Sequence, residues 1–455
     1  MEKICVDIAI VGAGTAGISA FNALKHSGKS LLLIDEGPLG TTCARMGCMP
    51  SKAVLHAGKR WKTAKSIGAD VSLPKDGPQR LWQQAIQTRD ALTEGAAKRT
   101  QINAGEHLLM GHAQFVAPHL LRVGERLVLA KAFIVATGSS PYIPAAFAHL
   151  HSHILTTDTL FELEELPASI GIVGLGAIGL ELGLALARLD VEVIATGHNH
   201  QIAGIADPEI HARALALFGK ELPMWLGEPV TACLQGEQVH LQSGIHTASV
   251  DKLLVVAGRT PNIQGLHVEA AGLQPDTHGR LQIDPQSMRA SDAPIFFAGD
   301  VQPDRPLLHE ASFEGVAAAQ AALAHLSEQD WTPRSRQVPL AILFSDPDVC
   351  HVGMGYAQAM SCNAVIGRAD GQGNGRSKVM GATDNLLHIY VHPQTGRLLG
   401  ASMLLTQGES LAHLIAWAIQ SEQTVHELLD MPFYHPTIEE MLQSALKSAA
   451  HQIIN

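Results

Sequence analysis

Two segments of the chain share one order of apolar and glycine positions. Each has a short apolar run, a glycine-rich turn, a stretch of helical periodicity and a second apolar run. The first segment covers residues 8–35 and the second covers residues 170–194. Short apolar runs bounded by turns predict buried strands, and the periodic stretch between them predicts a helix. Each segment is therefore expected to form a strand–turn–helix–strand unit of an α/β protein.

The glycine spacing in both segments fits a turn that binds the pyrophosphate of a dinucleotide. The first glycine permits the tight turn, the second lets the phosphates approach the backbone, and the third lets helix and strand pack closely. These residues are Gly12, Gly14 and Gly17 in the first segment and Gly174, Gly176 and Gly179 in the second. One such motif can be a turn without a ligand, but two in the same context predict two bound dinucleotides.

The two segments differ where their second strand ends. In the first, Asp35 lies 23 residues after the first glycine, where a carboxylate can accept the hydroxyls of ribose. The second offers no carboxylate and no arginine at Ala195 or Thr196, and the nearest basic side chains are His198 and His200. The choice between NAD and NADP therefore stays open.

Further apolar runs predict more strands outside the repeated segments. They lie at residues 120–129, 132–136, 253–257, 295–298, 340–344, 386–391 and 398–405. Helical patterns follow at residues 409–422 and 437–449. This mixture beyond residue 337 predicts an α+β end domain, and the polar, proline-bearing residues 327–337 are typical of a domain boundary.

The composition narrows the class of partner. Of 455 residues, 46% are apolar and 16% charged, which excludes a disordered chain. The formal net charge of −11 argues against nucleic acid or an anionic membrane as the main partner. No apolar run is long enough to span a bilayer, and the six sparse cysteines favour reduced thiols in a cytoplasmic protein.

Two cysteines, Cys43 and Cys48, stand five residues apart. They could be two small buried apolar residues, half of a zinc site, or a redox disulfide. No second ligand pair stands at zinc spacing, so no metal is expected. Five residues of straight helix rise about 7.5 Å, which exceeds the usual Cα separation of a disulfide. A bond would need a distorted turn, which Gly47 and Pro50 allow, and a neighbouring dinucleotide fold makes the redox interpretation the favoured one.

A second constellation lies near the C-terminus. Thr437 and Glu440 have the spacing of a capping box that opens the last helix. The functional alternative is a base, His435, which Glu440 orients. From these residues alone, the capping interpretation is favoured.

Taken together, the motifs resemble the flavin-dependent pyridine nucleotide–disulfide oxidoreductases, and within them the dihydrolipoyl dehydrogenases most closely. The resemblance covers essentially the whole chain in the order of the family. Its motifs are the two glycine turns, the redox segment from Cys43 to Lys52, Ala136-Thr137-Gly138, Glu181, Gly258-Arg259 with Pro261-Asn262, Ala298-Gly299-Asp300, and His435-Pro436-Thr437 with Glu440.

The resemblance implies a fold of three domains and a homodimer. Residues 1–148 and 266–334 would form an FAD-binding domain that is split by an NAD(P)-binding domain at residues 149–265. Residues 335–455 would form an α+β dimerisation domain. FAD and NAD, or NADP, are the implied cofactors.

The resemblance also implies site residues. Besides the glycines and Asp35, the implied flavin site includes Thr42, Lys52, Ala113, Thr137, Gly138, Asp300, Leu308, His309 and Glu310. The second glycine turn and Gly258 would bind the nicotinamide dinucleotide. Glu181 would lie near the nicotinamide and pair with Lys52.

The implied chemistry is a dithiol–disulfide exchange. Cys43 would exchange with the substrate, Cys48 would face the flavin, and His435, oriented by Glu440, would serve the other subunit as thiol base. The substrate would be a dihydrolipoyl group on a protein, or a small dithiol, oxidised with NAD⁺. Two alternatives stay open: an NADPH-dependent reductase of another small disulfide such as glutathione, and a flavoprotein subunit whose turnover is incidental.

Three departures from the family pattern matter. Thr41 stands where the family has glycine in the phosphate turn, which puts a side chain there and bears on its φ angle. The family's His-x-His-Pro is here Phe433-Tyr434-His435-Pro436, which keeps the base but has Phe433 in place of the first histidine. Ala195 is taken as the position where dihydrolipoyl dehydrogenases usually have glutamate.

Overall fold

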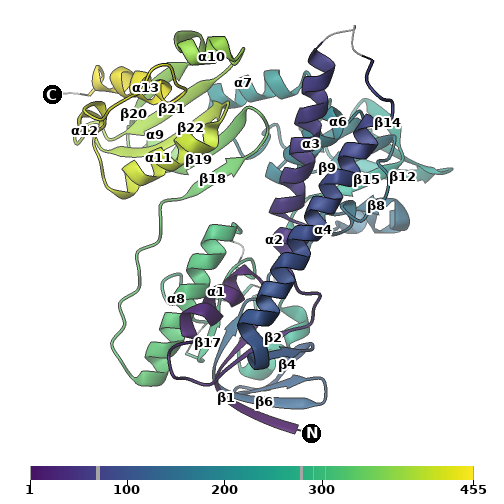
Figure 1. Ribbon diagram of the computed structural model, residues 1–455, viewed down its shortest axis with the longest axis vertical. Coiled ribbons are helices and arrows are strands. Elements are labelled where there is room, and N and C mark those ends of the chain that lie inside the picture. Colours follow the sequence, from purple (N-terminus) through teal and green to yellow (C-terminus); the bar gives the residue numbers. More distant parts are fainter. Residues whose placement is uncertain (1, 68–71, 277–279, 291, 303, 454–455) are drawn as a thin grey trace.

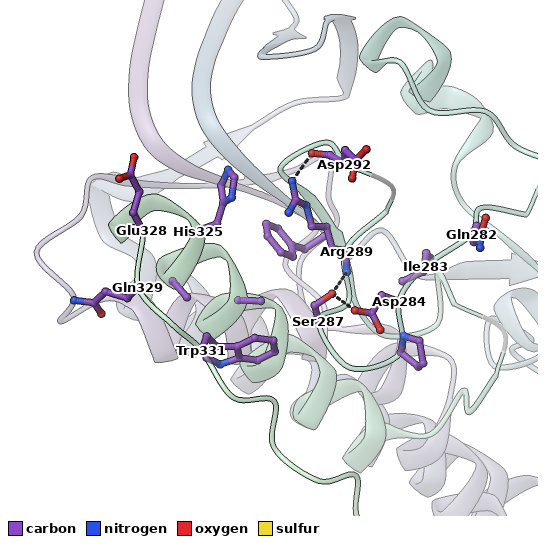
Figure 2. A pocket seen from close by; sticks show the side chains of 14 residues that line it. Gln282, Ile283, Asp284, Ser287, Arg289, Asp292, His325, Glu328, Gln329 and Trp331 are labelled. Carbon is purple, nitrogen blue, oxygen red and sulfur yellow. Dashed lines mark hydrogen bonds between the residues drawn. The ribbon is translucent and has the colours of Figure 1, made fainter.

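The computed structural model describes residues 2–67, 72–276, 280–290, 292–302 and 304–453. Three main sheets organise these residues. Figure 1 shows them at the bottom, at the upper right and at the upper left of the molecule. Two smaller sheets complete the strand pairing among the described residues.

The first sheet has seven strands and contains the first glycine turn. Its order is β3-β2-β1-β6-β5-β4, with β17 beside β6. The strands are β1 (Glu2–Val11), β2 (Leu31–Asp35), β3 (Leu108–Met110), β4 (Ala113–Ala117), β5 (Leu120–Val123), β6 (Arg126–Val135) and β17 (Ile295–Phe297). Ile8 and Ile10 face one apolar cluster while Ala9 and Val11 face another, because successive side chains of a strand point to opposite faces. Helices α1 (Thr15–Leu24) and α8 (Leu308–Ser327) pack together and contribute to the first of these clusters.

The second sheet is parallel throughout and contains the second glycine turn. Its order is β11-β10-β9-β15-β8. The strands are β8 (Ile154–Leu155), β9 (Ser169–Val173), β10 (Glu192–Gly197), β11 (Met224–Leu226) and β15 (Lys252–Val255). Helix α6 (Ala177–Arg188) joins β9 to β10, and α7 (Pro208–Phe218) follows. A small antiparallel sheet extends this region through β12 (Val230–Gln235), β13 (Gln238–Ser243) and β14 (His246–Val250).

The third sheet is antiparallel, in the order β18-β19-β22-β21-β20. Its strands are β18 (Leu340–Leu343), β19 (Asp348–Gly353), β20 (Val365–Asp370), β21 (Leu386–Val391) and β22 (Leu398–Leu405). The helices of this region are α9 (Tyr356–Ser361), α10 (Gly375–Val379), α11 (Gly408–Gln420), α12 (Val425–Leu429) and α13 (Glu440–Ala450). An extended segment, residues 328–339, connects α8 to this region along one side of the molecule (Figure 1). The expected fold class, two dinucleotide-binding sheets and an α+β end domain, is confirmed, while the domain boundaries stay a prediction.

Long helices join the three sheets. Helix α3 (Cys48–Ser66) lies beside α4 (Gly77–Ala104), and both extend from the first sheet toward the second (Figure 1). A Cβ on Gly58 of α3 would lie 2.8 Å from the carbonyl oxygen of Ala185, so glycine permits the close approach of α3 to α6. One apolar cluster combines α3, α4 and α6 with Leu343 of the third sheet. Within the described ranges, no helix combines the length and the hydropathy needed to cross a bilayer.

The glycine turn of the first sheet generates a stability prediction. A Cβ on Gly17 would lie 1.8 Å from the carbonyl oxygen of Gly12, whereas a Cβ on Gly14 would meet nothing within 4 Å. We expect Gly17→Ala to lower the free energy of unfolding of the cofactor-free protein by roughly 2–3 kcal/mol, because helix and strand must separate. The matched control, Gly14→Ala, should leave it within about 0.5 kcal/mol. Denaturant titration of both variants checks this, and equal destabilisation would contradict the packing role of Gly17.

Candidate functional site

A sharp turn brings the two predicted redox cysteines together. Helix α2 (Thr42–Arg45) ends just before Gly47, and α3 begins at Cys48. A Cβ on Gly47 would lie 3.0 Å from the carbonyl oxygen of Thr42 and 3.2 Å from the Cα of Cys43, so glycine allows the chain to fold back. The structure therefore has the distorted turn that the spacing requires. Both cysteines are free thiols, and their side chains share a hydrogen bond.

The two thiols differ in proton affinity. The hydrogen bond from Cys43, and after it the Lys52 ammonium group, lower the pKa of Cys48 to about 6 against the effects of burial and of the Glu181 carboxylate. The same hydrogen bond and burial raise the pKa of Cys43 well above the usual thiol range. Cys48 is also the first residue of α3, and a helix N-terminus favours a thiolate. Cys48 is thus the thiolate of the reduced pair near neutral pH, and Cys43 keeps its proton.

An ion pair lies beside the thiols. Lys52 stands one turn after Cys48 on α3, and its Nζ is 3.0 and 2.9 Å from the two carboxylate oxygens of Glu181 on α6. The Glu181 side chain is only 7% exposed, so its charge depends on these donors. The resemblance implies this pair, and the close packing of α3 on α6 produces it.

Phe344 also contacts this ion pair, a contact that the sequence patterns did not predict. The backbone N–H of Phe344 donates to Oε1 of Glu181 over 2.9 Å, and the Lys52 Nζ lies 4.8 Å from the centroid of the Phe344 ring. Phe344 ends an apolar run in a distant part of the sequence, so no local motif signals this contact.

The first glycine turn fits a dinucleotide. Gly12 has a φ of +105°, and a Cβ there would lie 2.3 Å from the carbonyl oxygen of Ala136. Gly14 and Gly138 instead border open space, as a turn that receives phosphates requires. Asp35 accepts the N–H groups of Ala13 and Gly37, each over 2.7 Å, which fixes its carboxylate beside the turn.

Other expected flavin-site residues lie at the same end of the first sheet or on α8. Thr137 donates through Oγ1 to the carbonyl of Asn262 over 2.8 Å. Burial raises the pKa of Asp300, which follows β17 closely. Nε2 of His309 is buried and has no hydrogen-bond partner within the described ranges, which leaves it available to a ligand.

Two of the expected residues have additional structural partners. Glu310 is 2% exposed and forms ion pairs with Arg305, at 3.1 Å, and Arg336, at 3.3 Å. Ala113 is buried in one of the apolar clusters of the first sheet. Leu308, by contrast, is 47% exposed at the start of α8, and Thr42 is exposed at the start of α2.

Thr41 keeps the backbone conformation of a glycine. Its φ is +61° and its ψ is 147°, a region that is strained for a β-branched residue. Its hydroxyl caps α2 by accepting the N–H of Ala44 over 3.3 Å. The substitution therefore preserves the shape of the turn and adds a helix cap.

The second glycine turn repeats the first. A Cβ on Gly174 would lie 2.6 Å from the carbonyl oxygen of Val256, and one on Gly179 would lie 1.9 Å from that of Gly174. Gly176 and Gly258 border open space. These residues therefore also fit a dinucleotide.

The strand register corrects the expected position of the missing acid. Val11 pairs with Ile34, directly before Asp35, and Val173 pairs with Thr196. Gly197, and not Ala195, is therefore the counterpart of Asp35. The expectation is wrong because β10 continues past its apolar run, where Thr196 is buried and its hydroxyl donates to the carbonyl of Ile172. The conclusion that no carboxylate stands at this position is unchanged.

His435 and Glu440 form a pair in the third region. Nδ1 of His435 lies 3.0 and 3.2 Å from the carboxylate oxygens of Glu440. The hydrogen bond from the backbone N–H of Thr437 is the main cause that lowers the pKa of Glu440, and the hydrogen bond with His435 is the second. The His435 side chain is 77% exposed and belongs to the segment that joins α12 to α13. Figure 1 shows these two helices away from α2.

The expected capping box is only half correct. The carboxylate of Glu440 does accept the N–H of Thr437 over 3.0 Å. The Thr437 hydroxyl, however, donates to the carbonyl of Tyr434, and α13 begins at Glu440. The expectation failed because the Thr437 hydroxyl is bonded to the Tyr434 carbonyl within the preceding turn and does not cap the helix. Glu440 therefore supports this turn and contacts His435 with the same carboxylate.

The difference between the thiols generates a pH prediction. In the pre-reduced protein, we expect alkylation of Cys48 by iodoacetamide to rise through a midpoint near pH 6, because the thiolate reacts. Cys43 should react only at higher pH. Peptide-resolved mass spectrometry checks both rates, with the exposed Cys362 as internal reference. A Cys48 midpoint near the ordinary thiol value of about 8.5 would contradict the assignment.

Comparisons with known proteins agree with this geometry. A family model described as pyridine nucleotide-disulphide oxidoreductase matches residues 6–325, and the model of its dimerisation domain matches residues 339–446. Dihydrolipoyl dehydrogenase from Halobacterium salinarum is 30% identical over 97% of this chain and 96% of its own length. The enzyme of that name from Geobacillus stearothermophilus is 28% identical over 97% of this chain and 95% of its own.

A solved structure shows the same fold. The HOCl-induced flavoprotein disulfide reductase RclA from Escherichia coli has a TM-score of 0.84 and 22% identity, and the match covers 97% of this chain and 99% of that one. The residues matched by the two family models include both glycine turns, the thiol turn and the third sheet. The chain therefore belongs to the pyridine nucleotide-disulphide oxidoreductase family and is a flavin-dependent disulfide oxidoreductase that uses FAD and NAD(P).

Proposed function

We propose that this enzyme oxidises dihydrolipoyl groups with NAD⁺, as a dihydrolipoyl dehydrogenase. The observation that carries the proposal is the thiol pair with unequal proton affinities, which lies beside Lys52 and Glu181. Near-full-length relatives with that name support the choice of substrate. The substrate would be a dihydrolipoyl group on a protein, or a small dithiol, in the cytoplasm.

The properties of the two cysteines assign their roles in the exchange. A substrate thiolate attacks the sulfur of Cys43 in the oxidised pair, the sulfur–sulfur bond breaks, and Cys48 leaves as a thiolate. Cys48 is the better leaving group because its pKa is the lower of the two. The second substrate thiol then attacks the mixed disulfide, which releases the cyclic disulfide product and the Cys43 thiol. Bound FAD supplies the two-electron acceptor between this dithiol pair and the nicotinamide.

A base must remove the proton from the substrate thiol, because only the thiolate attacks. The exposed His435 is suited to this, since Glu440 holds Nδ1 and leaves Nε2 free to accept a proton. His435 lies away from Cys43 in its own chain, so we assign it to the site of the other subunit of a homodimer. The match to a dimerisation domain supports that assignment.

One observation favours a second candidate, an NADPH-dependent reductase of a small disulfide such as glutathione. Gly197 stands at the position where a carboxylate would accept the adenosine ribose hydroxyls of NAD. A carboxylate there would also repel the extra phosphate of NADP, and Gly197 has none. His198 and His200 are exposed beside it. The nicotinamide preference is therefore the property that separates the two candidates.

The two candidates differ in a direct assay. The purified enzyme should reduce NAD⁺ with dihydrolipoamide much faster than it oxidises NADPH with glutathione disulfide. Initial rates with both nicotinamides against a panel of dithiols and disulfides check this. Faster turnover of glutathione disulfide with NADPH would replace the first candidate by the second.

The role of His435 makes a separate prediction. His435→Gln should lower dihydrolipoamide turnover by about 10²–10⁴-fold, because the substrate thiol loses its base. Reduction of ferricyanide by NADH, which needs no thiol base, should be retained. His426→Gln, an exposed histidine on α12, is the matched control and should leave both rates unchanged. Equal losses of both activities in His435→Gln would contradict the assigned role.

A further inference from the structure

We propose that Phe344 is a positioning residue that holds the Lys52–Glu181 pair in place and thereby sets the protonation of Cys48. The inference rests on the roles proposed above for Cys43 and Cys48. Phe344 directly follows β18 and lies within the match to the dimerisation domain, so it belongs to a different part of the fold from the thiol turn.

Phe344 contacts both ends of the ion pair. Its backbone N–H donates to the carboxylate of Glu181 over 2.9 Å. Its ring faces the ammonium group of Lys52, with the Nζ 4.8 Å from the ring centroid, which is within the range of a cation–π interaction. One residue therefore restrains the anion through its backbone and the cation through its side chain.

The position of this pair matters because its two charges act on Cys48 in opposite directions. The Lys52 ammonium group stabilises the Cys48 thiolate, and the Glu181 carboxylate destabilises it. The Cys43 thiol, which donates to Cys48, is the third group that acts on it. The balance of the two charges depends on how close the ammonium group stays to Cys48, and the Phe344 ring restrains the ammonium group together with the Glu181 carboxylate.

The loop that carries Phe344 is anchored on the same two helices. Nη2 of Arg188 on α6 donates to the carbonyl of Asp346 over 3.1 Å, and Nζ of Lys59 on α3 lies 3.2 Å from the Asp346 carboxylate. Ser345 is fully buried and donates to the carbonyl of Pro347 over 2.7 Å. Because α3 carries Lys52 and α6 carries Glu181, these contacts keep the loop in register with the pair.

The test measures the pH midpoint of Cys48 alkylation in the reduced holoenzyme. Phe344→Leu keeps the backbone N–H and much of the apolar volume but removes the aromatic face. Its midpoint should rise by about half a unit, the size expected for an exposed cation–π contact. Phe344→Trp keeps an aromatic face and should retain the wild-type midpoint. The long-wavelength thiolate–flavin absorbance of the two-electron-reduced enzyme should titrate with the same shift in Phe344→Leu.

A matched substitution separates positioning from stability. Phe147 is buried in a different apolar cluster, so Phe147→Leu should lower the melting temperature without moving the midpoint. An unchanged midpoint in Phe344→Leu, or the same shift in Phe147→Leu, would overturn the inference. A wild-type midpoint in the ordinary thiol range would instead contradict the proposed role of Cys48 and overturn the inference with it.

Discussion

The ion pair between Lys52 and Glu181 is the interaction on which the arrangement of the site depends. It joins α3, which begins with the thiolate cysteine, to α6, which follows the second glycine turn. A nearly buried carboxylate is costly unless strong donors surround it, so the two helices cannot shift apart without exposing or orphaning a charge. The pair thus ties the redox turn of one sheet to the nucleotide turn of the other.

The backbone geometry of the thiol turn gives its two cysteines different proton affinities. Gly47 lets the chain fold back, so that Cys43 points its thiol at a residue that starts a helix and stands one turn before a lysine. The hydrogen bond from Cys43 and the Lys52 ammonium group favour negative charge on Cys48, whereas burial and the hydrogen bond to Cys48 oppose it on Cys43. The reduced pair is therefore polarised, and under the proposed function the same difference in pKa makes Cys48 the better leaving group when the oxidised pair is attacked at Cys43.

Local patterns suffice to locate the glycine turns and the two cysteines, because each depends on residues close together in the sequence. The contact between His435 and Glu440 is expected only from the family resemblance, since the local pattern by itself favours a capping box. Patterns fail where a longer-range contact decides. The hydroxyl of Thr196 is satisfied by β9, so β10 extends to Gly197 beyond its apolar run. The contact of Phe344 with the ion pair depends on how the third sheet docks on α3 and α6. None of these contacts leaves a periodicity in the sequence.

The third sheet consequently serves the chemistry in two ways. Its helical part carries the exposed His435, which under the proposed function serves as the base for the site of the other subunit. Its first strand leads to Phe344, which contacts the ion pair of its own chain. Each catalytic centre of a homodimer would then be restrained by the third region of one subunit and supplied with a base by that of the other. Such an arrangement makes the active form of the thiol pair depend on folding of the C-terminal region as well as on dimerisation.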